Sequence, residues 1–211
     1  SGKSTEKSIS IDVQGPNTDP SCSIVSPNMG DSFVLGEAII FQATAADAEV
    51  SSDDLEIVWI SDKDGELGTG LVNSSGEVTF SYADLSANTH TIQFKAQDEL
   101  ESTCSDSIVI SVGTPPLLSL TSPTDGDVVS QGDLVQFVGM VQDDEDLPSS
   151  IALSWVSDID GEFSTQSANS NGDLELNTTS LSLGLHSITI TAIDSNGFSD
   201  SELISLRVNA L

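Results

Sequence analysis

The chain repeats itself at an offset of 96 residues, and this repeat restricts the possible folds more than any other feature. The segment WISDKDGE at 59–66 aligns with WVSDIDGE at 155–162 without a gap. When residues 23–113 are set against 119–209, 28 of the 91 positions are identical. Similarity of this kind indicates two copies of one folding unit. We therefore expect two homologous domains, 20–113 and 117–211, joined by a short stiff linker at 114–116.

The N-terminal segment resembles the end of the second repeat. Residues 1–13 align with 196–208, and Ile9 and Val13 fall on Ile204 and Val208. Residues 1–19 are therefore predicted to contain an extra N-terminal strand. Two interpretations stay open: the strand is the tail of a preceding repeat in a longer array, or it is donated to a neighbouring subunit, as in a pilus-like filament.

Apolar residues alternate with polar ones inside each repeat, with the period of two that is typical of half-buried strands. Gly, Asn, Asp, Ser and Pro separate these segments, and no amphipathic helix of ten or more residues is evident. About seven strands in about 95 residues indicate an immunoglobulin-like β-sandwich. We predict an all-β chain of two tandem sandwiches, with Trp59 and Trp155 in their cores. The clearest strand segments in the first repeat are 38–45, 55–60, 89–97 and 107–112.

The second repeat resembles the PKD-like and bacterial immunoglobulin-like (cadherin-like) domains that occur in tandem on microbial surface proteins. The resemblance rests on SWVSDIDGEF at 154–163 and LHSITITAIDSNGFSDSELISLRV at 185–208, and the first repeat shows the same pattern. It implies a non-catalytic extracellular or cell-surface segment: a stalk, an adhesin spacer or a filament subunit. Its partners would be neighbouring copies or repeats, or a host or cell-surface ligand. The first repeat departs from the pattern at 98–102, where the turn has lost its glycine.

The net charge excludes several classes of protein. With 34 acidic against 5 basic residues, the net charge is −29, so nucleic acid is a poor partner. No apolar stretch is long enough to insert into a membrane. No Gly-x-Ser-x-Gly motif, Walker loop or Ser/His/Asp set is evident, so we predict no enzymatic activity. His90 and His186 are interpreted as turn or edge residues.

A second class of function remains open, namely a module that binds a carbohydrate or a protein through its loops. Only 5% of the residues are aromatic, however, and most of these lie in strand segments. Few aromatic side chains therefore remain to stack on sugars.

The two cysteines are placed where they could form a disulfide. Cys22 and Cys104 begin the first and last predicted strands, and both strand starts lie at the same end of such a sandwich. A disulfide is geometrically reasonable there and would agree with an oxidising, extracytoplasmic setting. The alternative is two unpaired small core residues. The second repeat has Leu118 and Asp200 at these positions.

Calcium is the predicted cofactor. Acidic side chains cluster in loops at one end of the predicted sandwich, and hard cations such as calcium take six to eight oxygen ligands. One candidate site is a cluster that follows the second predicted strand of repeat 2, together with an aspartate after the sixth. Repeat 1 has a sparser counterpart. The Asp-x-Asp-Gly turns belong to the opposite end and could hold an ion between domains, although such turns are ordinary loop chemistry. The candidate ligands are Asp143, Asp144, Glu145, Asp146 and Asp194; Asp47, Glu49 and Asp98; and Asp62 and Asp64 with Asp158 and Asp160.

Two Asn-x-Ser/Thr triplets begin at Asn73 and Asn177 and are candidate glycosylation sites. Such triplets also arise by chance in a sequence that is rich in Ser, Thr and Asn.

Overall fold

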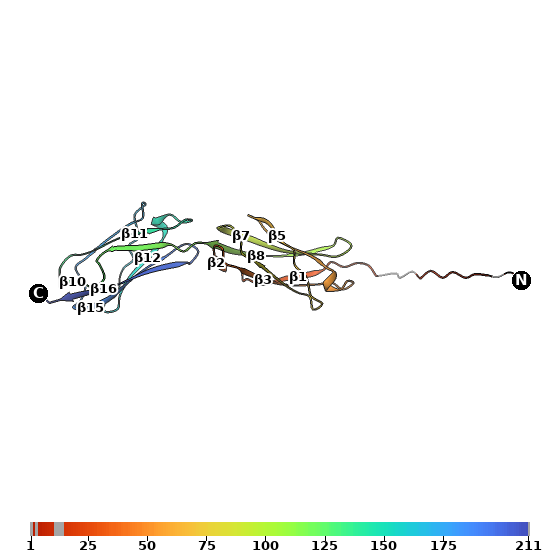
Figure 1. Ribbon diagram of the computed structural model, residues 1–211, viewed down its shortest axis with the longest axis horizontal. Coiled ribbons are helices and arrows are strands. Elements are labelled where there is room, and N and C mark those ends of the chain that lie inside the picture. Colours follow the sequence, from red (N-terminus) through yellow and green to blue (C-terminus); the bar gives the residue numbers. More distant parts are fainter. Residues whose placement is uncertain (1, 3, 11–14, 211) are drawn as a thin grey trace. The chain divides into compact units, whose positions relative to one another are not determined.

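The structure is a computed structural model that describes residues 2, 4–10 and 15–210 (Figure 1). Its strands come from residues 21–113 in the first repeat and 117–209 in the second. Two short 3-10 turns, Ser52–Asp54 and Pro148–Ser150, are the helical elements of this part of the chain, and none of its helices could cross a membrane.

The first domain is a sandwich of two sheets. A three-stranded sheet has the order β1-β3-β6, and a five-stranded sheet has the order β2-β8-β7-β4-β5. The strands are β1 (Ser21–Ser26), β2 (Ser32–Val34), β3 (Ile39–Ala46), β4 (Glu56–Ser61), β5 (Gly65–Gly68), β6 (Glu77–Tyr82), β7 (Asn88–Gln97) and β8 (Thr103–Gly113).

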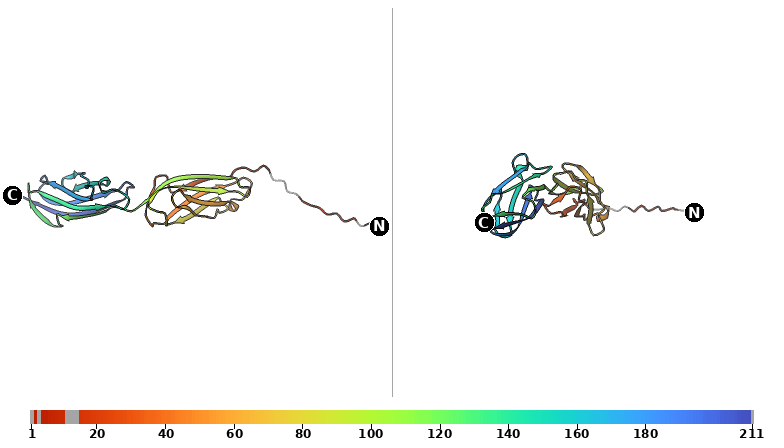
Figure 2. Two further views of the ribbon diagram at one scale, coloured as in Figure 1. Left: turned by 90° about the horizontal axis from the view of Figure 1, so that it is seen from above. Right: turned by 60° about the vertical axis from the view of Figure 1, so that its left-hand side comes forward.

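The second domain repeats this topology. Its three-stranded sheet has the order β14-β11-β9 and its five-stranded sheet the order β10-β16-β15-β12-β13, and the two layers can be followed in Figure 2. The strands are β9 (Leu117–Ser122), β10 (Asp127–Ser130), β11 (Val135–Gln142), β12 (Ala152–Ser157), β13 (Gly161–Ser164), β14 (Asp173–Thr178), β15 (Gly184–Ile193) and β16 (Ser199–Asn209). The immunoglobulin-like, all-β fold is thus confirmed.

Each described domain has one strand more than the seven predicted. The extra strand arises because the first predicted strand is divided: β1 pairs with β3 in one sheet, whereas β2 pairs parallel to β8 in the other. Pro27 has no N–H to donate, and Gly30 has a φ of 89°, which favours glycine. The chain therefore leaves one layer after β1 and joins the other at β2.

The cores follow from the alternation of apolar residues. In β3 every second side chain is buried, beginning with Ile39. Trp59 and Trp155 are 0% and 1% exposed, which confirms their predicted place in the core. Phe41 lies 5.2 Å from Trp59 between ring centroids, and Phe137 lies 5.6 Å from Trp155.

The predicted N-terminal strand falls partly outside the described residues, because residues 1, 3 and 11–14 are among those not described. Residues 2, 4–10 and 15–20 are not in a strand. Whether residues 1–19 supply a strand to another repeat or subunit therefore stays a prediction.

Candidate functional site

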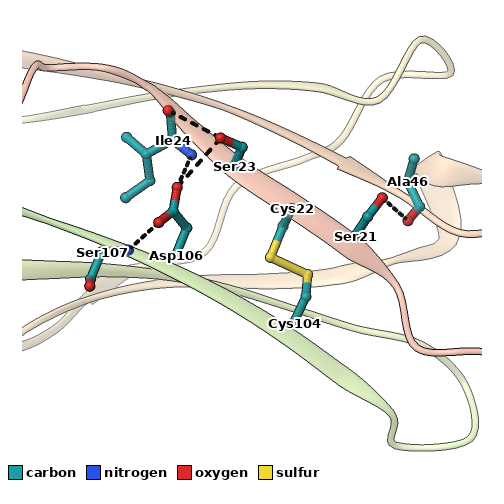
Figure 3. The surroundings of a disulfide bond; sticks show 8 residues. All are labelled: Ser21, Cys22, Ser23, Ile24, Ala46, Cys104, Asp106 and Ser107. Carbon is teal, nitrogen blue, oxygen red and sulfur yellow. Dashed lines mark hydrogen bonds between the residues drawn. A yellow bond between two sulfur atoms is a disulfide. The ribbon is translucent and has the colours of Figure 1, made fainter.

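The two cysteines form the predicted disulfide (Figure 3). Cys22 is the second residue of β1 and Cys104 the second residue of β8, and their Cα atoms are 5.9 Å apart. The bond joins the two sheets of the first domain, so the interpretation as unpaired core residues is wrong. Beside it, Asp106 on β8 accepts a hydrogen bond of 2.8 Å from the backbone N–H of Ile24 on β1.

The second domain joins the equivalent strands without a covalent bond. Asp200 stands where the first domain has Cys104, and Leu118 stands where it has Cys22. The backbone N–H of Leu118 donates to Oδ2 of Asp200 at 2.9 Å. A hydrogen bond to a carboxylate therefore spans the same gap between β9 and β16.

Two of the predicted calcium ligands in the second domain cap their own turns. Oδ1 of Asp143 accepts the N–H groups of Glu145 and Asp146, at 2.8 and 2.7 Å. Oδ1 of Asp194 accepts those of Asn196 and Phe198, both at 2.8 Å. This is the turn chemistry that Asp favours. One oxygen of each carboxylate is thereby committed to the backbone.

The remaining oxygen of Asp143 is not satisfied by the turn. Oδ2 of Asp143 is buried and has no hydrogen-bond partner in the part of the chain that the structure describes. Asp194 is only 8% exposed. Its pKa is raised above 3.8, chiefly by burial and further by the negative charge of Asp143. Two carboxylates, one buried and one with an oxygen that lacks a partner among the described residues, thus lie close together.

The equivalent pair in the first domain is built alike but has one additional partner. Oδ1 of Asp47 accepts the N–H of Glu49 at 2.8 Å, and its Oδ2 is buried without a partner among the described residues. Asp98, however, receives a 2.8 Å hydrogen bond at Oδ2 from Nδ2 of Asn17. This bond is the main cause of the lowered pKa of Asp98. The second repeat has Gly113 in place of Asn17 and so lacks this donor.

The other acidic residues of the cluster hold neighbouring backbone. Asp146 accepts hydrogen bonds from the N–H and Oγ of Ser195, whereas Asp144 is exposed. Oε2 of Glu145 accepts the N–H and Oγ1 of Thr114, at 3.2 and 2.8 Å. Glu49 holds Thr18 in the same way.

As they lie, the His, Cys, Asp and Glu side chains of the described residues include no group of three that could hold a metal ion. The structure therefore brings the acidic cluster and Asp194 to one end of the second domain, but most of these carboxylates accept hydrogen bonds from backbone N–H groups. A calcium ion would have to draw on the Asp143 and Asp194 pair together with other oxygens.

The Asp-x-Asp-Gly turns are organised by a residue that sequence reasoning did not single out. Oγ of Ser61 accepts the N–H groups of Lys63 and Asp64, and Ser157 caps the equivalent turn. Asp62 uses Oδ1 to accept the N–H of Thr91 on β7 at 2.7 Å. Asp158 binds the N–H of Ser187 in the same way. These aspartates thus tie each hairpin to the neighbouring strand.

The interpretation of the histidines as turn or edge residues is wrong. His90 and His186 lie within β7 and β15 and are 0% exposed. Nε2 of His186 is 2.7 Å from the carbonyl oxygen of Ser182, and Nδ1 is 2.7 Å from Oγ of Ser157. Polar partners at both ring nitrogens allow the imidazole to be buried. The sequence did contain a signal, since His186 has the same parity as the buried Ile188 and Ile190.

Ser157, His186 and Asp160 do come together, although no such set was evident in the sequence. Oδ2 of Asp160 is 3.7 Å from Nδ1 of His186, the nitrogen that also contacts Ser157. A hydrolytic triad needs the serine and the acid on opposite nitrogens and an exposed hydroxyl. Ser157 is 1% exposed. The set therefore has the geometry of a structural clamp.

The two candidate glycosylation sites differ in their surroundings. Oδ1 of Asn73 accepts the N–H groups of Ser75 and Glu77, and its Nδ2 donates to the Glu77 carboxylate at 3.0 Å. Asn169 makes the same bonds in the second repeat without a sequon. Asn73 is thus accounted for as a turn residue, whereas Asn177 is exposed on β14.

Comparisons with known proteins identify the fold. No family model and no curated protein matches the chain. The I-band fragment I67-I69 of titin matches 92% of this chain with a TM-score of 0.54 and 18% identity. An E-to-A variant of the same three-domain fragment matches with a TM-score of 0.52 and 18% identity. The chain covers 66% and 67% of these two structures. The similarity shows tandem immunoglobulin-like domains.

Proposed function

We propose that the chain is a non-catalytic structural segment of an extracellular microbial surface protein, in which immunoglobulin-like domains serve as a stalk, a spacer or part of a filament. The observation that carries this proposal is that the polar side chains of both domains form structural hydrogen bonds. In both domains the side chains that could have formed a reactive site instead fasten turns to strands, and the Ser157 and His186 pair is buried. The disulfide favours an oxidising compartment.

Calcium binding by the second domain belongs to the same proposal. The support is the buried Oδ2 of Asp143, which has no partner among the described residues, beside the buried carboxylate of Asp194. Burial of a charged oxygen without a partner is costly, and a divalent cation would compensate both charges. Two carboxylates would supply part of the six to eight oxygens that calcium takes. In the first domain, the hydrogen bond from Asn17 already satisfies Asp98.

A thermal unfolding experiment tests calcium binding one domain at a time. Trp155 reports on the second domain in a Trp59→Phe variant, and Trp59 reports on the first in a Trp155→Phe variant. Because a ligand that binds only the folded state stabilises it by mass action, calcium at 100 times its Kd would add about 2.7 kcal/mol. We expect millimolar calcium to raise the second domain's Tm above its value in EDTA.

Asp143→Asn should abolish that rise, and Asp47→Asn, the matched change in the first domain, should leave the rise in the second domain intact. Equal midpoints of the unsubstituted second domain in EDTA and in calcium would contradict calcium binding. The structural role would be contradicted separately, by hydrolytic activity that is lost in Ser157→Ala.

A further inference from the structure

The two domains differ in the segment that follows the edge strand of the five-stranded sheet. In the second domain this segment is fastened from both sides. Nε1 of Trp155 donates to the carbonyl oxygen of Gln166 at 3.1 Å, and Nε2 of Gln166 donates to the carbonyl oxygen of Glu175 at 2.6 Å. The segment after β13 is thereby held against the core tryptophan and against β14.

The first domain lacks both of these fastenings. Gly70 stands in the place of Gln166 and has no side chain to reach across. Nε1 of Trp59 is buried and has no hydrogen-bond partner among the described residues. Leu71, the next residue, is 90% exposed. The segment after β5 therefore has no counterpart of the bonds that hold its equivalent in the second domain.

A groove of about 410 Å³ lies beside this segment. Leu55, Ile57, Val58 and Leu71 give it apolar walls, and Glu56 and Glu66 place carboxylates along it. Lys95 also contributes to the lining. The groove thus combines apolar surface with acidic side chains.

The groove lies beside a part of β4 that does not pair with β5. β5 pairs with β4 only over Trp59, Ile60 and Ser61. The preceding residues of β4, 56–58, pair with β7 on one side and have no paired strand among the described residues on the other. They line the groove together with Lys95 and Gln97 of β7. An uncovered strand edge presents backbone N–H and C=O groups that can pair with another chain.

We propose that this edge groove of the first domain binds an extended, basic segment of a partner protein, which adds to β4 as a further strand. In this mode of recognition the main chain supplies hydrogen bonds, and alternate side chains supply specificity. Apolar residues at every second position would cover Leu55, Ile57 and Leu71, and the intervening Lys or Arg side chains would approach Glu56 and Glu66. A second copy of this chain is a poor occupant, because each copy carries a net charge of −29.

An NMR titration tests the proposal with a defined probe, the capped peptide KVTVKVTVK, on the intact ¹⁵N-labelled chain. We expect saturable shifts of the amides of residues 55–58, with a Kd that rises with ionic strength because charge attraction contributes. The equivalent amides, residues 151–154, are the internal reference and should stay unchanged. The charge-reversed peptide EVTVEVTVE should bind at least about tenfold more weakly, a change of 1.4 kcal/mol.

Matched variants separate the groove from general charge attraction. Glu66→Lys should weaken binding of the lysine peptide about tenfold, equivalent to 1.4 kcal/mol, whereas Glu162→Lys, at the same position of the second domain, should not. Gly70→Gln with Leu71→Ser copies the second domain's segment and should close the groove. A Cβ at Gly70 would meet the flexible end of Ile57 at 3.1 Å.

Absence of binding, or equal weakening by the two lysine variants, would overturn the proposal. Dimerisation of the free chain through the amides of residues 55–58 would also overturn it, since the occupant would then be a second copy.

Discussion

The two domains share a strand order and a set of identical residues, yet they fasten the same pair of strands in different ways. The first domain has the Cys22–Cys104 disulfide in addition to the hydrogen bond from Ile24 to Asp106, whereas the second has the hydrogen bond from Leu118 to Asp200. Both solutions bridge the start of the first strand and the start of the last. The comparison teaches that the sandwich requires these two strands to be close but does not require a covalent bond.

The largest expected effect is loss of the disulfide. The double variant Cys22→Ala/Cys104→Ala should destabilise the first domain by about 4 to 5 kcal/mol, because the closed loop of 82 residues restricts the unfolded chain. Denaturant unfolding followed through Trp59, in the Trp155→Phe background, measures the change. The second domain is the control and should unfold at its original midpoint. An unchanged midpoint of the first domain would show that the bond contributes little to its stability.

The buried histidine comes next. His186→Ala should destabilise the second domain by about 2 to 4 kcal/mol, because it leaves a cavity and removes the partner of the Ser157 hydroxyl and the Ser182 carbonyl. Ser187→Ala changes a neighbouring exposed residue and should have little effect. Urea unfolding followed through Trp155 gives both values. Equal stabilities of the two variants would argue against a clamp.

The non-covalent link of the second domain should contribute less than the disulfide does. Asp200→Ala removes the acceptor for the N–H of Leu118 and should cost about 1.5 to 3 kcal/mol, the range for a hydrogen bond to a charged group. The same urea experiment measures it. Asp200→Cys with Leu118→Cys should restore or exceed the original stability if the strands are as close as in the first domain. Failure of this pair to cross-link would show that the two gaps differ.

The smallest expected effect is a difference in pH dependence between the equivalent carboxylates Asp194 and Asp98. The pKa of Asp194 is raised in the folded state, so its contribution to stability is greatest below the unfolded pKa and is lost as the pH rises through and above 3.8. The pKa of Asp98 is lowered, so its contribution is present above 3.8 and is lost as the pH falls below it.

As the pH rises, ionisation of Asp194 should lower the stability of the second domain, and Asp194→Asn should remove this loss. Ionisation of Asp98 should raise the stability of the first domain, and Asp98→Asn should remove this gain. Thermal unfolding of each domain in EDTA from pH 3 to 6 measures both slopes. If both substitutions changed the slope of stability against pH in the same direction, the hydrogen bond from Asn17 would not distinguish the two sites.

Much of the fold could be predicted because it depends on short-range pattern. The alternation around Trp59 places that side chain in a core, and the positions of Cys22 and Cys104 at strand starts place them together. The division of the first strand was missed because it depends on which sheet the chain joins after Pro27. The histidines were misread because burial of an imidazole depends on polar partners such as Ser157 and Ser182, and the distant Ser157 becomes one only when strands pair.

The candidate calcium site shows the same limit. Acidic residues at strand ends indicated which end of the domain to examine. Which carboxylate keeps an unpartnered oxygen depends, however, on the backbone N–H groups that the loops present. The surroundings of the second carboxylate in the first domain depend on Asn17, which lies 81 residues away from Asp98 along the chain and donates a hydrogen bond to it.

The sequence by itself determined that this chain contains two homologous sandwiches and that two cysteines occupy the starts of strands. A repeat and a period of two can be read from the order of residues along the chain, without knowledge of tertiary contacts. Only the tertiary structure decided that the indole N–H of Trp59 has no partner in the described part of the chain, that both ring nitrogens of His186 have polar partners, and that a groove lies beside β4. Each of these depends on a partner supplied, or not supplied, by another strand, because hydrogen bonding and burial are set by distances that folding creates.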